Sequence, residues 1–322
     1  MAGANLKEAN LSGSNLSGAD LSGAILEGAN LENTNLDRAN LERAILTSAC
    51  LRSATLNTAN LKNASLQRAS AERCDFTSIE AHGADFTGAK LSEATMVRAD
   101  LESCILNAAQ LRGTNLKEAR LVSAQLRKAD LTSSVCFAAV MDQADFTGAT
   151  LTSALLENAS ICRANLTSAV VAEVNARRCR LEGSNLSRAD ATRAQLSGAD
   201  LSGADMTGAC LVNAVMEGTR LAGCIMTEAN LSKCNASAAV MDDANLTRAV
   251  VEQANLRDVQ LRSATLTHAR MVGVILEGAD LTSSVLRDAD LTGAKLGGVK
   301  LNGADLARAN LTDAQLAKAD LT

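Results

Sequence analysis

The sequence repeats itself every five residues along its whole length. With blocks centred at residues 6, 11, 16 and every fifth position to 321, the frame never slips across 64 blocks. The central residue is Leu in 45 blocks, and the residue two positions earlier is Ala in 47. Between them lies most often Asn or Asp, and the two residues after the centre are mostly polar or small. A period of five matches neither the 3.6 of a helix nor the 2.0 of a long strand.

The five-residue block fits a short alternating segment followed by a corner. The first and third residues point inward, the second points outward, and the last two turn the chain. A block this small buries almost nothing alone, so successive blocks must stack into a solenoid. The composition agrees, because 47% of the residues are hydrophobic while Pro, Trp and Tyr are absent and only four Phe occur. Such a chain has a narrow interior of Ala and Leu rather than a thick core.

The motif A-[N/D]-L-x-x, as in Ala4-Asn5-Leu6 and Ala19-Asp20-Leu21, resembles the repeat of the pentapeptide-repeat proteins. The resemblance covers essentially the whole chain. It implies an all-β solenoid, a right-handed quadrilateral β-helix with four pentads per coil. On that basis 64 pentads make about 16 coils, and a rise of about 4.8 Å per coil predicts a rod of about 77 Å. We expect residues 1–322 to form a single domain.

One predicted coil tests the four-sided interpretation. Its four central positions hold Ala71, Phe76, Ala81 and Phe86 in turn. Two large residues on opposite sides, offset by two small ones, keep the interior volume constant only if all four share one cross-section. The spacing therefore favours four pentads per coil.

The nine cysteines follow the repeat rather than a disulfide or zinc pattern. No two are 20 residues apart and no C-x-x-C occurs, so we expect neither disulfides nor a metal site. Free thiols in this number fit a reducing, intracellular compartment, with the cytoplasm as the simplest choice. We expect six in the interior, namely Cys74, Cys104, Cys136, Cys179, Cys224 and Cys234, and three pointing outward, namely Cys50, Cys162 and Cys210.

The sequence offers no constellation for catalysis. The only histidines, His82 and His268, fall on different predicted sides without a partner for metal ligation or nucleophile activation. Acidic residues are placed by the repeat, and no long loop interrupts it. We therefore expect a protein that is not an enzyme and binds no cofactor. The start of the chain is already patterned and polar, and the longest apolar run, 135–141, is too short to cross a membrane.

One functional hypothesis comes from a branch of the resembled family, the quinolone-resistance proteins, which imitate DNA and bind type II topoisomerases. A DNA mimic about 77 Å long would replace about 45 phosphate charges. This chain carries 31 basic and 36 acidic residues, a net charge of −5. The four predicted sides carry 0, −2, +1 and −4. No side is strongly acidic, so DNA mimicry is the alternative interpretation, and direct nucleic-acid binding is not expected.

The favoured hypothesis is a protein-binding scaffold or structural rod within a larger assembly. Its evidence is a run of outward positions that have lost polarity, which suggests a partner site. The competing explanation is neutral drift, because single exposed apolar residues are normal. Ile25 and Ile45 form a weaker second patch. The predicted partner-binding residues are Val135, Phe137, Val140 and Leu155.

A solenoid without polar caps exposes strand edges at its ends. The repeat occupies the sequence from its first residues to its last, so we expect end-to-end self-association or capping by a partner protein.

Overall fold

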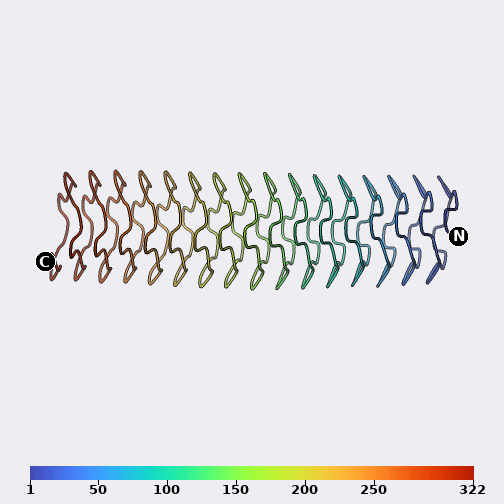
Figure 1. Ribbon diagram of the computed structural model, residues 1–322, viewed down its shortest axis with the longest axis horizontal. Coiled ribbons are helices and arrows are strands. Elements are labelled where there is room, and N and C mark those ends of the chain that lie inside the picture. Colours follow the sequence, from blue (N-terminus) through green and yellow to red (C-terminus); the bar gives the residue numbers. More distant parts are fainter. The chain divides into compact units, whose positions relative to one another are not determined.

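The computed structural model describes residues 1–322. It divides into two compact units, Met1–Asn165 and Leu166–Thr322, and each is described by itself. Figure 1 shows the same coil repeated within each of them. The expectation of one domain over residues 1–322 stays a prediction.

Each coil contains 20 residues. The structure contains no extended strands. Successive coils are joined by isolated parallel β-bridges between residues that lie 20 positions apart in the sequence. In the first unit the bridges run from Asn5↔Ile25 to Asp145↔Asn165. In the second they run from Val170↔Asp190 to Lys300↔Asp320. Because a coil of 20 residues holds four pentads, the coil is four-sided, as the sequence predicts.

Hydrogen bonds between coils surround each bridge. At the first bridge the Leu6 N–H donates to the Ile25 carbonyl at 2.7 Å, and the Ile25 N–H donates to the Ala4 carbonyl at 2.9 Å. A third bond between coils, from the Gly3 N–H to the Ser22 carbonyl, lies at the corner. The backbone polar groups are thus satisfied by the neighbouring coil, which is the condition for burying so narrow an interior.

The interior is built from the first and third residues of each pentad. From Leu21 to Leu301 these positions are buried, and the outward second position is not. The coil of mixed sizes also has the expected form, since Ala71, Phe76, Ala81 and Phe86 are all buried. The predicted burial of the thiols is confirmed, because Cys50, Cys162 and Cys210 are partly exposed and the other six are buried.

Some interior positions carry hydroxyl groups, which are hydrogen-bonded. The Thr114 hydroxyl donates to the Leu91 carbonyl at 2.8 Å, and the Thr219 hydroxyl donates to the Leu196 carbonyl at 2.9 Å. Because these donors are satisfied, they substitute for Ala without the cost of a buried unpaired group.

The corners are β-turns with one residue in the left-handed region. In the turn Leu6–Ala9 the Ala9 N–H donates to the Leu6 carbonyl, and Glu8 has φ of 55°. Positive φ confined to the third turn residue is the pattern of a type II turn. Every pentad has it, but glycine fills this position in only 20 of them. The sequence suggests small or turn-forming residues at the corners, whereas Arg, Glu and Lys frequently adopt the left-handed conformation there.

Candidate partner-binding surface

The four predicted partner-binding residues lie around one corner of the first unit. Val135 and Leu155 are joined by a parallel bridge on one side of the coil. Phe137 is the first residue of the corner that ends that side, closed by the bond from the Ala139 N–H to the Cys136 carbonyl. Val140 lies on the next side, bridged to Arg120 and Ser160. We call these four residues the corner cluster.

The corner cluster contains two of the few large apolar side chains that the structure exposes. Phe137 is 38% exposed and Leu155 is 44% exposed, while Val135 and Val140 are partly buried. Elsewhere the position of Leu155 is most often held by Asn or Asp, whose side-chain oxygen accepts a hydrogen bond from the corner backbone. An example is Asn5, whose Oδ1 accepts from the Lys7 N–H at 3.2 Å. Leu155 and Val135 cannot make this bond, so the turn geometry does not explain their presence.

Charged residues flank Phe137 on both sides along its corner. Lys117 stands one coil before it, and its Nζ lies 5.9 Å from the centroid of the phenyl ring. Glu157 stands one coil after it, and its carboxylate makes no ion pair within the unit. The corner therefore presents a cation, an aromatic ring and an anion in that order.

Other apolar positions are more isolated. Ile25 and Ile45 are joined by a bridge, and Ile45 is 41% exposed, so the weaker second patch is a contiguous pair. Sequence analysis missed Ile225, which is 44% exposed in the second unit between the polar residues Asp205 and Asn245. Ile225 breaks the rule that the second pentad residue is polar, so it could have been identified from the sequence.

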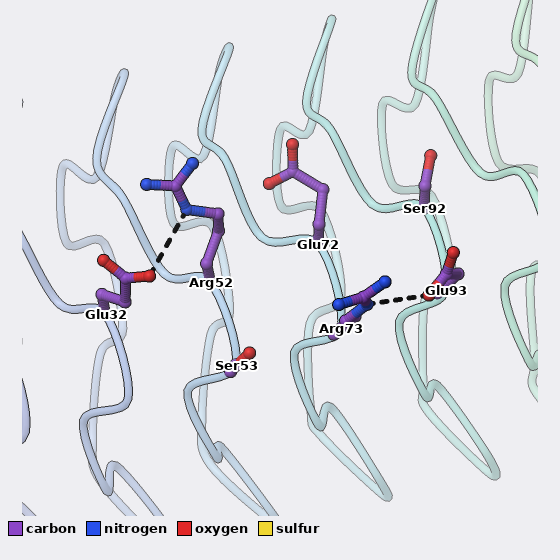
Figure 2. A pocket seen from close by; sticks show the side chains of 7 residues that line it. All are labelled: Glu32, Arg52, Ser53, Glu72, Arg73, Ser92 and Glu93. Carbon is purple, nitrogen blue, oxygen red and sulfur yellow. Dashed lines mark hydrogen bonds and ion pairs between the residues drawn. The ribbon is translucent and has the colours of Figure 1, made fainter.

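A charged groove lies on another side of the first unit (Figure 2). Its walls contain two ion pairs, Arg52 with Glu32 at 3.7 Å and Arg73 with Glu93 at 2.8 Å. Glu72 stands between them in the groove, and its Oε2 atom is buried without a hydrogen-bond partner. Apart from this carboxylate, the groove's charges neutralise one another, and its lining contains no cysteine or histidine.

The side with the most negative sequence charge, −4, is interrupted by cations, as the sequence indicates. Glu80 and Asp100 are neighbours across a bridge, but Lys62 Nζ lies 2.5 Å from Glu80. Arg120 is 2.7 Å from Glu102, the next acidic residue on that side. The cluster is therefore partly neutralised by the coils before and after it.

The histidines occupy exposed corners. His82 is the first residue of one turn, and His268 has φ of 58° in another. No group of three or more His, Cys, Asp or Glu side chains is arranged to hold a metal ion.

The repeat model for pentapeptide repeats matches residues 1–132 and 144–322 in a series of segments. The chain belongs to the pentapeptide repeat family. The fold of this family is a right-handed quadrilateral β-helix, and members are generally not enzymes. The short unmatched stretch of this pentapeptide repeat protein, 133–143, contains Val135, Phe137 and Val140.

Solved pentapeptide repeat structures resemble parts of the chain. HetL from the cyanobacterium Nostoc sp. strain PCC 7120, described as involved in heterocyst differentiation regulation, is 29% identical over 77% of this chain and 89% of its own, with a TM-score of 0.23. The plasmid-mediated fluoroquinolone resistance protein QnrB1 is 22% identical over 52% of this chain and 85% of its own, with a TM-score of 0.32.

A protein from the Arabidopsis thaliana thylakoid lumen is 29% identical over 36% of this chain and 71% of its own, with a TM-score of 0.20. These TM-scores are low, so the family assignment depends on the repeat model. No curated protein sequence matches the chain. The structure contains no helix with the length and apolar character needed to cross a membrane.

Proposed function

We propose that this pentapeptide repeat protein is a non-enzymatic binding scaffold whose partner protein contacts the corner cluster. The observation that carries the proposal is the exposure of Phe137 and Leu155 beside Val135 and Val140, four apolar residues gathered around one corner. Aromatic residues set among smaller apolar contacts are typical anchors of protein interfaces. At four pentads per coil, the 64 pentads amount to about 16 coils, which would offer a partner a regular array of polar positions around this anchor.

The energetic gain from covering the corner cluster is moderate. Fully burying a Phe or Leu side chain contributes about 1.5–3 kcal/mol, and these two are roughly 40% exposed, so each would contribute about 1 kcal/mol. A stable complex therefore needs additional contacts from the polar surroundings. Capping or end-to-end pairing of the chain, expected from the sequence, would be a separate interaction.

The alternative function is mimicry of DNA toward a type II topoisomerase, suggested by the likeness to a fluoroquinolone resistance protein. The charge of the chain argues against DNA mimicry. The most acidic side of the repeat carries −4, and its Glu80 and Glu102 carboxylates are paired with Lys62 and Arg120. A mimic needs an unbroken row of negative charge, because the phosphate charge dominates affinity for DNA-binding enzymes.

The test compares three forms of the tagged chain in captures from the organism that encodes it. They are the wild type, Phe137→Glu, and the control Ser12→Glu, which adds the same charge at an equivalent exposed corner position. A scaffold that uses the corner cluster retains its partner in the wild type and control and loses it with Phe137→Glu. Retention by all three forms would refute the proposed surface.

A supercoiling assay with purified DNA gyrase separates the two functions. The scaffold proposal expects no inhibition by any form of the chain. Inhibition at micromolar concentration, unchanged by Phe137→Glu, would instead establish the topoisomerase alternative.

A further inference from the structure

We propose that the partner at the corner cluster is a second copy of this chain, packed antiparallel about a two-fold axis that passes beside Phe137. The inference rests on the proposed function, since it uses the same surface and specifies its occupant.

A cation, an aromatic ring and an anion follow one another at equivalent corner positions. Lys117, Phe137 and Glu157 are the first corner residues of three successive coils, 20 residues apart. Consecutive coils are joined by the bridges Asn115↔Val135 and Val135↔Leu155, so the three side chains are neighbours along the corner. Along this corner the charge is therefore positive one coil before Phe137 and negative one coil after it.

In a two-fold interface the same surface is used twice, so that if residue i of one copy contacts residue j of the other, residue j of the first contacts residue i of the second. If the coils of the two copies run in opposite directions with Phe137 at the axis, Lys117 of each copy faces Glu157 of the other. Phe137 then faces its own counterpart. The pattern is self-complementary, and each charge pair forms twice.

A parallel arrangement of the two copies is unfavourable. If the coils ran in the same direction, Lys117 would face Lys117 and Glu157 would face Glu157. Like charges placed opposite each other are destabilising, so the surface selects the antiparallel pairing.

Both charged groups are available to a partner chain. The Lys117 side chain is 47% exposed, and its ammonium has a long contact to Glu118 of 3.6 Å in addition to the ring of Phe137. An exposed ion pair of this kind contributes little, so Lys117 can exchange it for a partner carboxylate. The Glu157 carboxylate has no competing ion pair within the unit.

The apolar residues supply the centre of the same interface. Val135 and Val140 flank Phe137 on the two sides that meet at the corner, and Leu155 extends the apolar area by one coil. This area is smaller than the roughly 800 Å² per partner of a standard stable interface, so the dimer should dissociate at low protein concentration.

The experiment is sedimentation velocity of the full chain over a range of concentrations, at low and at high salt. Four forms are compared: wild type, Lys117→Glu, the exchange Lys117→Glu/Glu157→Lys, and Phe137→Glu. The single charge reversal is expected to weaken dimerisation about tenfold or more, because a two-fold axis makes each substitution count twice. The charge exchange restores the wild-type dissociation constant, and Phe137→Glu gives a monomer.

The matched control is Lys7→Glu, which reverses a charge at an equivalent corner position away from the corner cluster and leaves dimerisation unchanged. A wild-type chain that remains monomeric, or a dimer that all four forms share, would overturn the inference. Failure of the exchange to rescue Lys117→Glu would overturn the antiparallel pairing. If the wild type is monomeric while Phe137→Glu abolishes capture of another protein, the proposed function stands and this inference alone fails.

Discussion

The rings of Phe76 and Phe86 meet edge to face inside one coil of the first unit, with centroids 6.2 Å apart and planes at 89°. They come from opposite sides of the coil, and the two remaining sides contribute Ala71 and Ala81 at the same level. The interior of a pentapeptide repeat coil thus has a nearly constant volume that two large and two small side chains can fill as well as four leucines.

The Phe76 position is therefore expected to be sensitive to size. Phe76→Ala should lower the free energy of unfolding by about 3–5 kcal/mol, because it leaves a cavity in a coil that cannot collapse. Ala81→Leu alone should overpack the coil and cost about 1–3 kcal/mol. Denaturant unfolding of both variants and their combination measures the coupling. Additive losses in the double variant would show that the two positions do not share one cross-section.

A second prediction concerns backbone strain at the corners. Ala238 is exposed with φ of 55°, a conformation that disfavours any residue with a Cβ atom. Ala238→Gly should raise the free energy of unfolding by about 0.5–1 kcal/mol despite the added chain entropy. The control Ala222→Gly, at a corner position without positive φ, should lower it. Equal effects at Ala238 and Ala222 would contradict the assigned turn geometry.

The buried thiols should be inert in the native protein. Burial raises the pKa of Cys136 to about 11 and that of Cys104 to about 12, so almost no thiolate forms near neutral pH. A thiol-reactive dye should label three cysteines rapidly in the native chain and nine after denaturation. Cys50→Ser should reduce the native number to two. Rapid labelling of more than three would show that the coils open readily.

The same thiols predict loss of stability in alkali. Their pKa values are raised above 9.0 in the folded chain, so the unfolded chain loses its thiol protons first as the pH increases. The contribution of the buried thiols to the free energy of unfolding is complete below about pH 9 and decreases as the pH rises from there toward about 12. Unfolding measured at pH 8 and pH 10 should differ less for Cys104→Ala than for the wild type. An unchanged difference would rule out titration of this thiol.

Asp280 provides the opposite pH dependence. The Thr282 hydroxyl donates to Asp280 Oδ1 at 2.6 Å and the Thr282 N–H at 3.1 Å, and these bonds lower the pKa of the carboxyl below 3.8. The stabilisation is present above the unfolded-state pKa and is lost as the pH falls through the folded-state value. Thr282→Val should cost about 1 kcal/mol at pH 7 and less at pH 2.

An NMR titration of the Asp280 carboxyl measures the effect directly and should show a higher pKa in Thr282→Val. The control Thr247→Val, whose hydroxyl donates to Oδ1 of the neutral Asn245 at 2.7 Å, should have an effect that does not change between pH 7 and pH 2. A pKa of Asp280 that is unaltered by Thr282→Val would contradict the role of the hydroxyl.

Most of the fold could be predicted from the sequence, because the five-residue period encodes it locally. The alternation of Ala, outward residue and Leu determined which side chains are buried, and the buried state of Cys74 and Cys234 follows from the same rule. The sequence also determined which outward positions lost polarity, including Val135 and Leu155. These properties depend on neighbours along the chain, so they require no knowledge of distant contacts.

Only the tertiary structure decided which outward residues meet. Lys117 contacts Phe137, and Val135 pairs with Leu155, because a coil of 20 residues brings these positions side by side. The left-handed conformation of residues such as Glu8 could not be predicted from the residue type either, because closing a four-sided coil imposes positive φ on whichever residue occupies that position. The local sequence determines whether a side chain points inward or outward. Stacking of the coils determines which outward side chains become neighbours and which corner residues adopt the left-handed conformation.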